Sequence, residues 1–247
     1  MSKQDYVYGT HAVVSLIENE PERIIELYAL KGKEDSKYLS IINTVKQYGI
    51  SVVFVNRKTL DEKVFGGVHQ GLVAKVKSAK ELGSNELTDF LSTKNEFFFL
   101  ILDNVTDPHN LGACLRNCDG AGVDAIICAK DKSAPLSSTA KKVACGATEH
   151  IPVFYVTNLA RTLDELHDNN VHIVGTAGET EKLVYDVDLK GSLAIVMGAE
   201  ETGMRRLTRE KCDEIVKLPM YGTCTSLNVS VATGICLYEV VRQRLGK

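Results

Sequence analysis

Three polar loops, each directly after an apolar run, hold the residues of this chain whose types and spacing could do chemistry. The first contains Pro108, Asn110 and Gly112, and Arg116 follows on the helix that this loop begins. Pro108 ends the extended segment before it, Asn110 is a good N-cap for the helix that follows, and Gly112 allows another backbone to approach the first turn of that helix. Neighbours on one helix face are three or four residues apart, so Asn110 and Arg116 converge on a cleft only if Asn110 is the cap. The alternatives are that Asn110 only caps the helix and that Arg116 only lies on a solvated face.

The second loop, which opens with Gly198, imitates a phosphate-binding loop without being one. Gly198 and Gly203 have the glycine spacing of that loop, but Met204 and Arg205 stand where lysine and serine or threonine are required. No GxGxxG follows a predicted strand either, so the sequence excludes both common nucleotide-binding fingerprints. Glu200 in this loop is then either a carboxylate that faces some other ligand or a solvated surface charge.

The third loop joins Leu218 to a long apolar helix that begins near Asn228. A helix start leaves backbone N–H groups without partners inside the helix, and these groups can hold a carboxylate or an adenine edge. One residue suffices as a cap, so either Ser226 or Asn228 is free for another task, with capping alone as the alternative for each. Although periodicity does not name a reaction, the three loops together predict a cleft lined by Asn110, Arg116, Glu200, Ser226 and Asn228.

Alternating strands and helices must position these loops. From residue 96 onward the strands are almost continuously apolar, which is typical of a parallel sheet covered by helices on both faces. In such sheets ligands bind at the carboxyl ends of the strands, where all three loops lie. The expected strands are Phe97 to Leu102, Ala125 to Cys128, Val153 to Val156, His172 to Thr176, Leu193 to Met197 and Ile215 to Leu218. The expected helices begin near Asn110, cover Thr139 to Cys145 and Leu159 to His167, and end with Asn228 to Arg244.

The first part of the chain is predicted to be a smaller α/β domain. Its expected elements are helices over His11 to Asn19 and Asp35 to Tyr48 and strands over Ile24 to Leu30, Ser51 to Val55 and Leu72 to Val76. The polar stretch that follows suits a linker with a short helix around Leu87 to Leu91. We therefore assign residues 1–78 to a first domain, 79–95 to a linker and 96–247 to a second domain.

Composition excludes several classes of protein. The 247 residues are 44% hydrophobic and 25% charged, as in a folded globular protein. The longest apolar runs fall far short of the roughly 20 residues that cross a bilayer, and the polar start lacks the features of a signal peptide. We therefore expect a cytoplasmic protein without a membrane partner. The net charge of −3 does not indicate nucleic-acid binding, so any RNA phosphates must meet local patches or a dimer surface. The candidates for such contacts are Lys130, Lys132, Lys141, Lys142, Arg205, Arg206 and Arg209.

The seven cysteines are spread over the second part of the chain, and their spacing predicts neither disulfides nor a structural zinc site. We expect them to be small buried hydrophobic residues.

The three loops, in this order, resemble the motifs of the SpoU/TrmH branch of the SPOUT RNA methyltransferases. The matching residues are Asp107 to Gly112 with Arg116, then Gly198-Ala199-Glu200 with Gly203, and finally Leu218-Pro219-Met220 with Ser226 to Ser230. Further segments resemble the members that methylate a guanosine ribose in bacterial 23S ribosomal RNA. These segments are Tyr8 to Val13, Leu30 to Asp35, His69-Gln70-Gly71 and Lys141 to Ala147, so the resemblance covers nearly the whole chain.

This resemblance implies a small ribosomal-protein-like α/β domain that recognises RNA, followed by a parallel-sheet domain with a C-terminal trefoil knot. It implies a homodimer that uses S-adenosyl-L-methionine, without a metal, to methylate a ribose 2′-hydroxyl. The implied substrate is a guanosine in the P loop of the peptidyl-transferase region, in 23S rRNA or a pre-ribosomal large-subunit particle. The implied cofactor-binding residues are Thr176, Gly198, Leu218, Met220 and Leu227.

Arg116 matches the family's proposed base for the 2′-hydroxyl. Because a guanidinium is a poor base at neutral pH, our hypothesis is that Arg116 orients a phosphate and stabilises the developing alkoxide. Asn110, Glu200, Ser226 and Asn228 would hold Arg116 and the ribose. Three other functions stay open on the sequence: a ribose methyltransferase acting on tRNA or other rRNA, a non-catalytic RNA-binding assembly protein, and a small-molecule methyltransferase.

Overall fold

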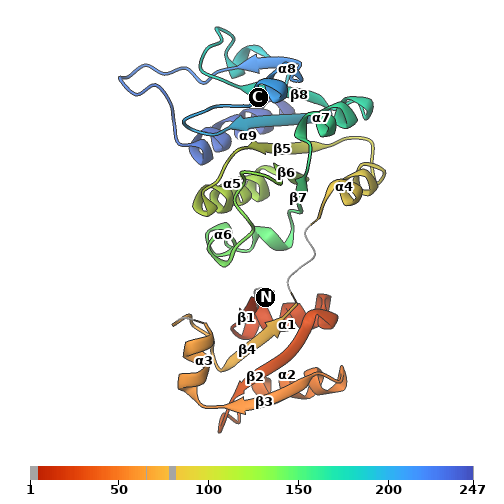
Figure 1. Ribbon diagram of the computed structural model, residues 1–247, viewed down its shortest axis with the longest axis vertical. Helices are drawn as coiled ribbons and strands as arrows, with labels where there is room; N and C mark the ends of the chain where they lie inside the picture. Colours follow the sequence, from red (N-terminus) through yellow and green to blue (C-terminus); the bar gives the residue numbers. More distant parts are fainter. Residues whose placement is uncertain (1–4, 65, 78–81, 247) are drawn as a thin grey trace. The chain divides into compact units, whose positions relative to one another are not determined.

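The computed structural model describes residues 5–64, 66–77 and 82–246. The chain divides into two compact units, residues 1–80 and 81–247 (Figure 1). The predicted linker overlaps this division. Its residues 79–81 lie outside the described residues, whereas helix α4 (Ser84–Leu91) belongs to the second unit, because Leu87 and Leu91 are buried in that unit's core.

The first unit is built on a four-stranded mixed sheet in the order β1-β4-β2-β3. Strand β4 pairs antiparallel with β1 and β2, and β2 pairs parallel with β3. One face carries α1 (Thr10–Asn19) and α2 (Ser36–Gln47), and the other carries α3 (Arg57–Lys63), which buries Leu60. The strands are β1 (Asp5–Tyr8), β2 (Ile24–Leu30), β3 (Ser51–Val55) and β4 (Leu72–Val76).

The second unit is built on a six-stranded parallel sheet in the order β10-β8-β9-β5-β6-β7. Its central strands are almost continuously apolar because both faces are covered, as the sequence predicts, with Asp103 at the end of β5 as the charged exception. The strands are β5 (Phe98–Asp103), β6 (Ala125–Ala129), β7 (Val153–Val156), β8 (His172–Thr176), β9 (Leu193–Gly198) and β10 (Glu214–Val216).

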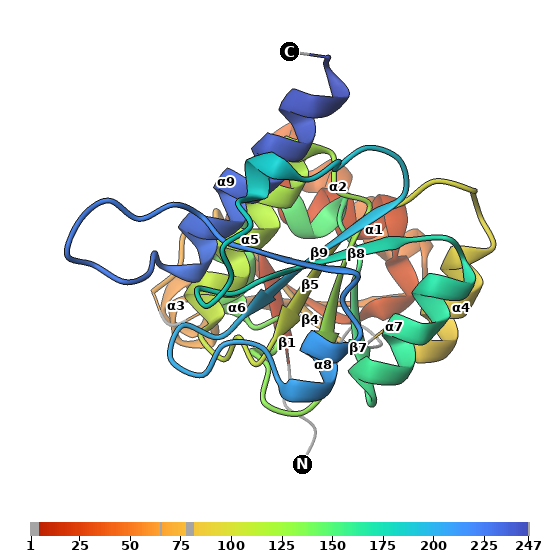
Figure 2. The ribbon, with the colours of Figure 1, turned by 90° about the horizontal axis from the view of Figure 1, so that it is seen from above.

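Two layers of helices enclose this sheet (Figures 1 and 2). One layer consists of α5 (Pro108–Ala121), α6 (Ser138–Ala144) and α9 (Val229–Arg244). The other contains α4, α7 (Leu159–Asp168) and α8 (Arg206–Glu210). The predicted α/β architecture with a parallel sheet is therefore confirmed, while β1, α3 and α8 are elements that the sequence analysis did not predict.

The first helix of this unit begins earlier than predicted. Asp107 is the N-cap of α5, because its carboxylate accepts a hydrogen bond from the N–H of His109 at 2.9 Å. The prediction that Asn110 caps this helix is wrong, since Asn110 lies inside the first turn and its side chain is left for other partners. Gly112 does allow a close backbone approach, as expected, because a Cβ there would lie 2.5 Å from the carbonyl oxygen of Ala140.

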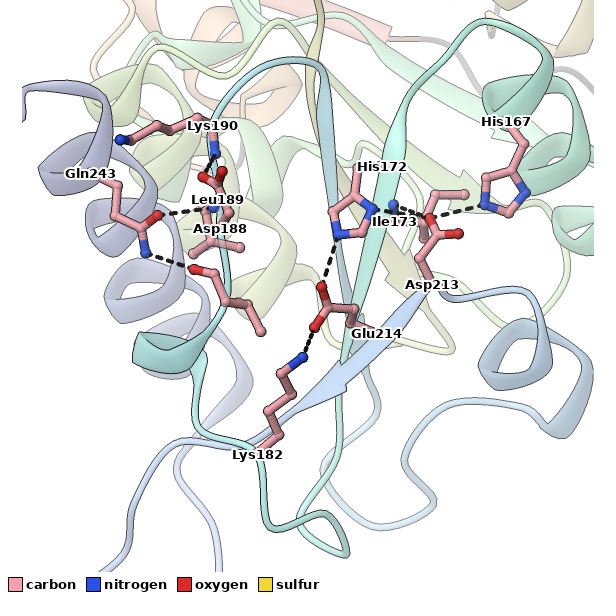
Figure 3. A network of polar contacts seen from close by, with 11 residues as sticks. His167, His172, Ile173, Lys182, Asp188, Leu189, Lys190, Asp213, Glu214 and Gln243 are labelled. Atoms are coloured by element: carbon pink, nitrogen blue, oxygen red, sulfur yellow. Dashed lines mark hydrogen bonds and ion pairs between the residues drawn. The ribbon is translucent and has the colours of Figure 1, made fainter.

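A polar network ties the starts of β8 and β10 together, at the edge where these parallel strands begin (Figure 3). The Asp213 carboxylate accepts a hydrogen bond from the N–H of Ile173 at 2.7 Å and lies 3.1 Å from His167 Nε2. His172 lies 3.4 Å from both Asp213 and Glu214. These contacts hold the short edge strand β10 in register, and β10 leads into the third polar loop.

The cysteines divide into two groups. Cys114, Cys118, Cys128 and Cys236 are buried, and Cys212 is partly buried, as expected of small hydrophobic side chains. Burial raises the pKa of Cys114 to about 11 and of Cys236 to about 12. The prediction is wrong for Cys145 and Cys224, which are exposed because both lie outside regular elements, at a helix end and in a loop.

No helix within residues 5–64, 66–77 and 82–246 is both long enough and apolar enough to cross a membrane.

Candidate active site

A cavity of about 310 Å³ lies at the carboxyl edge of the parallel sheet. Thr176 is the last residue of β8 and Gly198 the last of β9, and both line it. The third polar loop and the start of α9 complete the wall. The cavity thus brings together all of the residues that the resemblance assigns to the cofactor: Thr176, Gly198, Leu218, Met220 and Leu227.

Hydrophobic side chains and paired charges share the lining. Met197 and Cys236 belong to the core beneath the cavity, and Leu218 packs against the same core. At the rim, the Arg209 guanidinium donates to the Glu179 carboxylate at 3.2 Å, and both residues line the cavity. Small-molecule sites usually combine a hydrophobic lining with polar groups that fix the ligand's orientation, and this volume lies near the lower end of their usual range of about 300–1,000 Å³.

Gly198 is required by the protein's own backbone. A Cβ at this position would lie 2.4 Å from Gly203 C and from Met204 N. The two chain segments approach because Ala199 and Gly203 exchange backbone hydrogen bonds of 2.9 and 3.2 Å, which close a tight turn. The closest neighbour of Gly198 is the returning loop, and the turn gives the cavity wall a fixed shape.

Glu200 is the centre of a polar cluster that joins all three loops. Its Oε1 accepts hydrogen bonds from Asn228 Nδ2 at 2.6 Å, from the N–H of Val229 at 3.0 Å and from Asn110 Nδ2 at 3.4 Å. Asn228 Nδ2 also donates to Asn110 Oδ1 at 3.0 Å. The carboxylate lies at the start of α9, where the helix dipole and free N–H groups stabilise negative charge. Asn110, Glu200 and Asn228 are therefore neighbours, although up to 118 residues separate them in sequence.

Asn228 has two tasks, because its two amide atoms point to different partners. Its Oδ1 caps α9 by accepting from the N–H of Ser230 at 3.0 Å, while its Nδ2 donates to the cluster. Capping and site formation, which the sequence analysis treated as alternatives, are thus combined in one side chain. Ser226, two residues before Asn228 in the sequence, is exposed and lines the cavity.

Arg116 is exposed on α5, and its side chain contacts the end of α6 instead of the cluster around Glu200. Its Nη1 lies 3.8 Å from Cys145 Sγ, at the end of α6. Among the described residues, no hydrogen bond joins Arg116 to Asn110, Glu200, Ser226 or Asn228. The hypothesis that those side chains hold Arg116 is therefore not met in this structure, where Cys145 is its partner.

Ion pairs within the chain account for three of the basic residues considered for RNA contacts. Arg205 Nε donates to the buried Asp103 carboxylate at 2.6 Å, and its N–H donates to the other oxygen at 2.8 Å. This pair fixes the loop after β9 against the end of β5. Arg206 and Arg209 pair with acidic neighbours, although Arg206 is exposed, as are Lys130, Lys132, Lys141 and Lys142.

The sequence analysis missed Glu179 as a cavity residue and Cys145 as a partner of Arg116. Glu179 lies in the loop that follows β8, so the rule that ligands lie at the carboxyl ends of strands could have found it. Nothing local to Cys145 indicates Arg116, because their proximity depends on the packing of α5 against α6.

Comparison with known proteins identifies both units. Residues 97–238 match the SpoU rRNA methylase family, and residues 6–82 match the RNA 2′-O ribose methyltransferase substrate-binding domain. The chain is 56% identical to the 23S rRNA (guanosine-2′-O-)-methyltransferase RlmB of Haemophilus influenzae over 247 residues, covering 100% of both chains. It is also 56% identical to RlmB of Vibrio vulnificus over 241 residues, covering 98% of each chain.

Solved structures agree on the fold. The SpoU methyltransferase AviRb from Streptomyces viridochromogenes, solved with the cofactor AdoMet, superposes with a TM-score of 0.78 at 22% identity. The superposition covers 99% of this chain and 92% of that one. With the family matches and the full-length identity to RlmB, it follows that this chain belongs to the SpoU family of RNA 2′-O-ribose methyltransferases.

Proposed function

We propose that the protein transfers a methyl group from S-adenosyl-L-methionine to the ribose 2′-hydroxyl of a guanosine in 23S rRNA, in the P loop of the peptidyl-transferase region. The observation that carries this proposal is the cavity at the sheet edge, bordered by the cluster of Asn110, Glu200 and Asn228. The full-length relatives named for 23S rRNA guanosine methylation supply the substrate.

The residues present fit the cofactor. Apolar side chains such as Leu218 and Leu227 suit an adenine ring, and the carboxylates of Glu200 and Glu201 suit a ligand that carries a sulfonium and an ammonium group. The rim guanidinium of Arg209 suits its carboxylate. When bound, S-adenosylmethionine supplies a methyl group made electrophilic by its sulfonium.

The chain's own residues then have to place the ribose. The closed turn between Ala199 and Gly203 keeps the cavity wall fixed, and the cluster around Glu200 presents amide groups that can hydrogen bond to a ribose. Arg116 orients a phosphate of the RNA and stabilises negative charge that develops on the 2′-oxygen. Fixed positioning of this kind supplies a large share of the rate enhancement in group-transfer reactions.

The remaining parts of the chain serve recognition and assembly. The first unit, which matches a substrate-binding domain, contacts the RNA, and the exposed lysines around α6 contact phosphates. Helix α9 exposes an apolar stripe of Val231, Ile235 and Tyr238, which are 51%, 37% and 54% exposed and share one helix face. We propose that this stripe pairs with a second copy of the chain, and that the homodimer acts in the cytoplasm on 23S rRNA or a pre-ribosomal large-subunit particle.

The test is methyl transfer from radiolabelled S-adenosylmethionine to RNA of three kinds: 23S rRNA, 16S rRNA and bulk tRNA, each lacking the modification. We expect label in 23S rRNA alone, and a loss of about 100-fold or more in the Arg116→Ala variant. Arg161→Ala, an exposed change on α7 of the second unit outside the cavity, is a matched control for a surface cation. Label in tRNA would instead assign the protein to another substrate class, and cofactor binding without transfer to any RNA would favour the non-catalytic function.

A further inference from the structure

Cys145 is exposed, adopts an unusual backbone conformation and contacts the guanidinium that the proposed reaction uses. It ends α6 with φ 52° and ψ 40°, in the left-handed region where glycine or asparagine is the usual residue. A non-glycine residue held in such a conformation costs stability and persists where its surroundings require it. Gly146 follows, also with a positive φ of 97°.

The thiol connects the end of α6 to Arg116. Cys145 Sγ lies 3.7 Å from the carbonyl oxygen of Lys142, to which the S–H donates, and 3.8 Å from Arg116 Nη1, from which the sulfur accepts. The backbone N–H of Cys145 also donates to that carbonyl, at 3.4 Å. The left-handed turn therefore aims the sulfur at α5, where a residue that continued the helix would aim its side chain elsewhere.

The two helices that carry this contact cannot shift easily against each other. A Cβ at Gly112 would lie 2.5 Å from the Ala140 carbonyl oxygen and 2.7 Å from Val143 Cβ, so α5 and α6 pack with backbone almost in contact. Cys145 is thus held at a fixed position relative to the helix that bears Arg116.

An exposed arginine without a partner samples many rotamers. Fixing its planar guanidinium in one direction reduces the side-chain conformational entropy that is lost when a substrate binds. We propose that Cys145 is a positioning residue for Arg116: its sulfur holds the guanidinium in the direction that the RNA phosphate and ribose require. This inference rests on the proposed methyl transfer to 23S rRNA.

The substitution Cys145→Gly distinguishes a role in positioning Arg116 from a role in folding. Cys145→Gly suits the left-handed backbone and removes the thiol together with Cβ from an exposed position, so we expect the free energy of unfolding to stay constant or rise. The rate constant kcat for methyl transfer is expected to fall about tenfold, while KM for S-adenosylmethionine stays unchanged, because Cys145 does not line the cofactor cavity. Cys145→Ser keeps an acceptor and is expected to retain most of the rate.

The matched control is Asn170→Gly. Asn170 also has a positive φ, 57°, but lies in the turn after α7, and the described contact of its backbone N–H is with His167. This change gives the same backbone relief without touching Arg116, so kcat should match that of the wild type.

A double-mutant cycle identifies the route of the effect. If Cys145 acts through Arg116, then adding Cys145→Gly to Arg116→Lys lowers the single-turnover rate less than twofold further. A wild-type kcat in Cys145→Gly would overturn the inference, and so would a full tenfold loss in the Arg116→Lys background. Either result is distinct from failure of the proposed function, in which the wild-type protein itself would not methylate 23S rRNA.

Discussion

The turn that closes on Gly198 should be the most sensitive backbone position of the site. In Gly198→Ala the new Cβ would meet Gly203 C and Met204 N at 2.4 Å, about 1 Å closer than an ordinary contact. Both obstacles are backbone atoms, so no side chain can rotate away. The returning strand of the turn must therefore move by about 1 Å, and the hydrogen bonds between Ala199 and Gly203 must stretch or break.

These contacts set the size of the expected loss in stability and in cofactor affinity. Overpacking costs about 1–3 kcal/mol and each weakened hydrogen bond about 1 kcal/mol, so we expect the free energy of unfolding to fall by about 2–4 kcal/mol. Because residues on both sides of the turn line the cavity, the affinity for S-adenosylmethionine should fall at least about tenfold.

Urea unfolding followed by circular dichroism measures the first quantity, and isothermal titration calorimetry with S-adenosylmethionine measures the second. Gly222→Ala is the matched control, because a Cβ at Gly222 meets nothing within 4 Å and Gly222 does not line the cavity. If Gly198→Ala unfolded and bound cofactor like the wild type, the turn would be more compliant than its contacts imply and the argument for a preformed wall would fail.

Three further predictions follow from buried or paired groups. Asp103→Asn should lower the free energy of unfolding by about 2–3 kcal/mol in urea titrations, because the fully buried carboxylate is the partner of Arg205; an unchanged midpoint would contradict this. Hydrogen bonds from Arg242 hold the pKa of Glu239 below its usual value, so the Glu239 carboxylate contributes stability above about pH 4 that is lost as the pH falls through its lowered pKa. Glu239→Gln should accordingly cost about 1 kcal/mol at pH 7 and progressively less toward pH 3, and a constant difference across urea titrations at pH 7, 5 and 3 would refute the assignment. A thiol reagent added to the native protein should rapidly modify the exposed Cys145 and Cys224, as counted by mass spectrometry. Rapid modification of the buried cysteines would instead show that the core opens.

Local pattern predicted most of the second unit's elements because strands buried on both faces read as apolar runs. The strands Val153–Val156 and His172–Thr176 have the predicted bounds. Helix α8 was missed because it has only five residues and little apolar periodicity. The N-cap of α5 was misplaced because Asp107 and Asn110 are both good caps, and the structure chooses Asp107. The trefoil knot stays a prediction from resemblance.

The candidate site depends on contacts that no local pattern encodes. Asn110 meets Glu200 because β5 and β9 pair in register, with Asp103 opposite Gly198. That pairing joins segments about 95 residues apart, and the sequence analysis could only place both loops at the same edge of the sheet. The partner of Arg116 was unpredictable for the same reason, since it depends on how α5 and α6 pack.

The most direct test of this account is to locate the modified nucleotide. Unmodified 23S rRNA is incubated with the protein and S-adenosylmethionine, digested into defined fragments and analysed by mass spectrometry. The account predicts one 2′-O-methylguanosine in the P loop of the peptidyl-transferase region, and none with Arg116→Ala. Methylation of a base instead of a ribose, or a modification that persists at the wild-type level in Arg116→Ala, would contradict it.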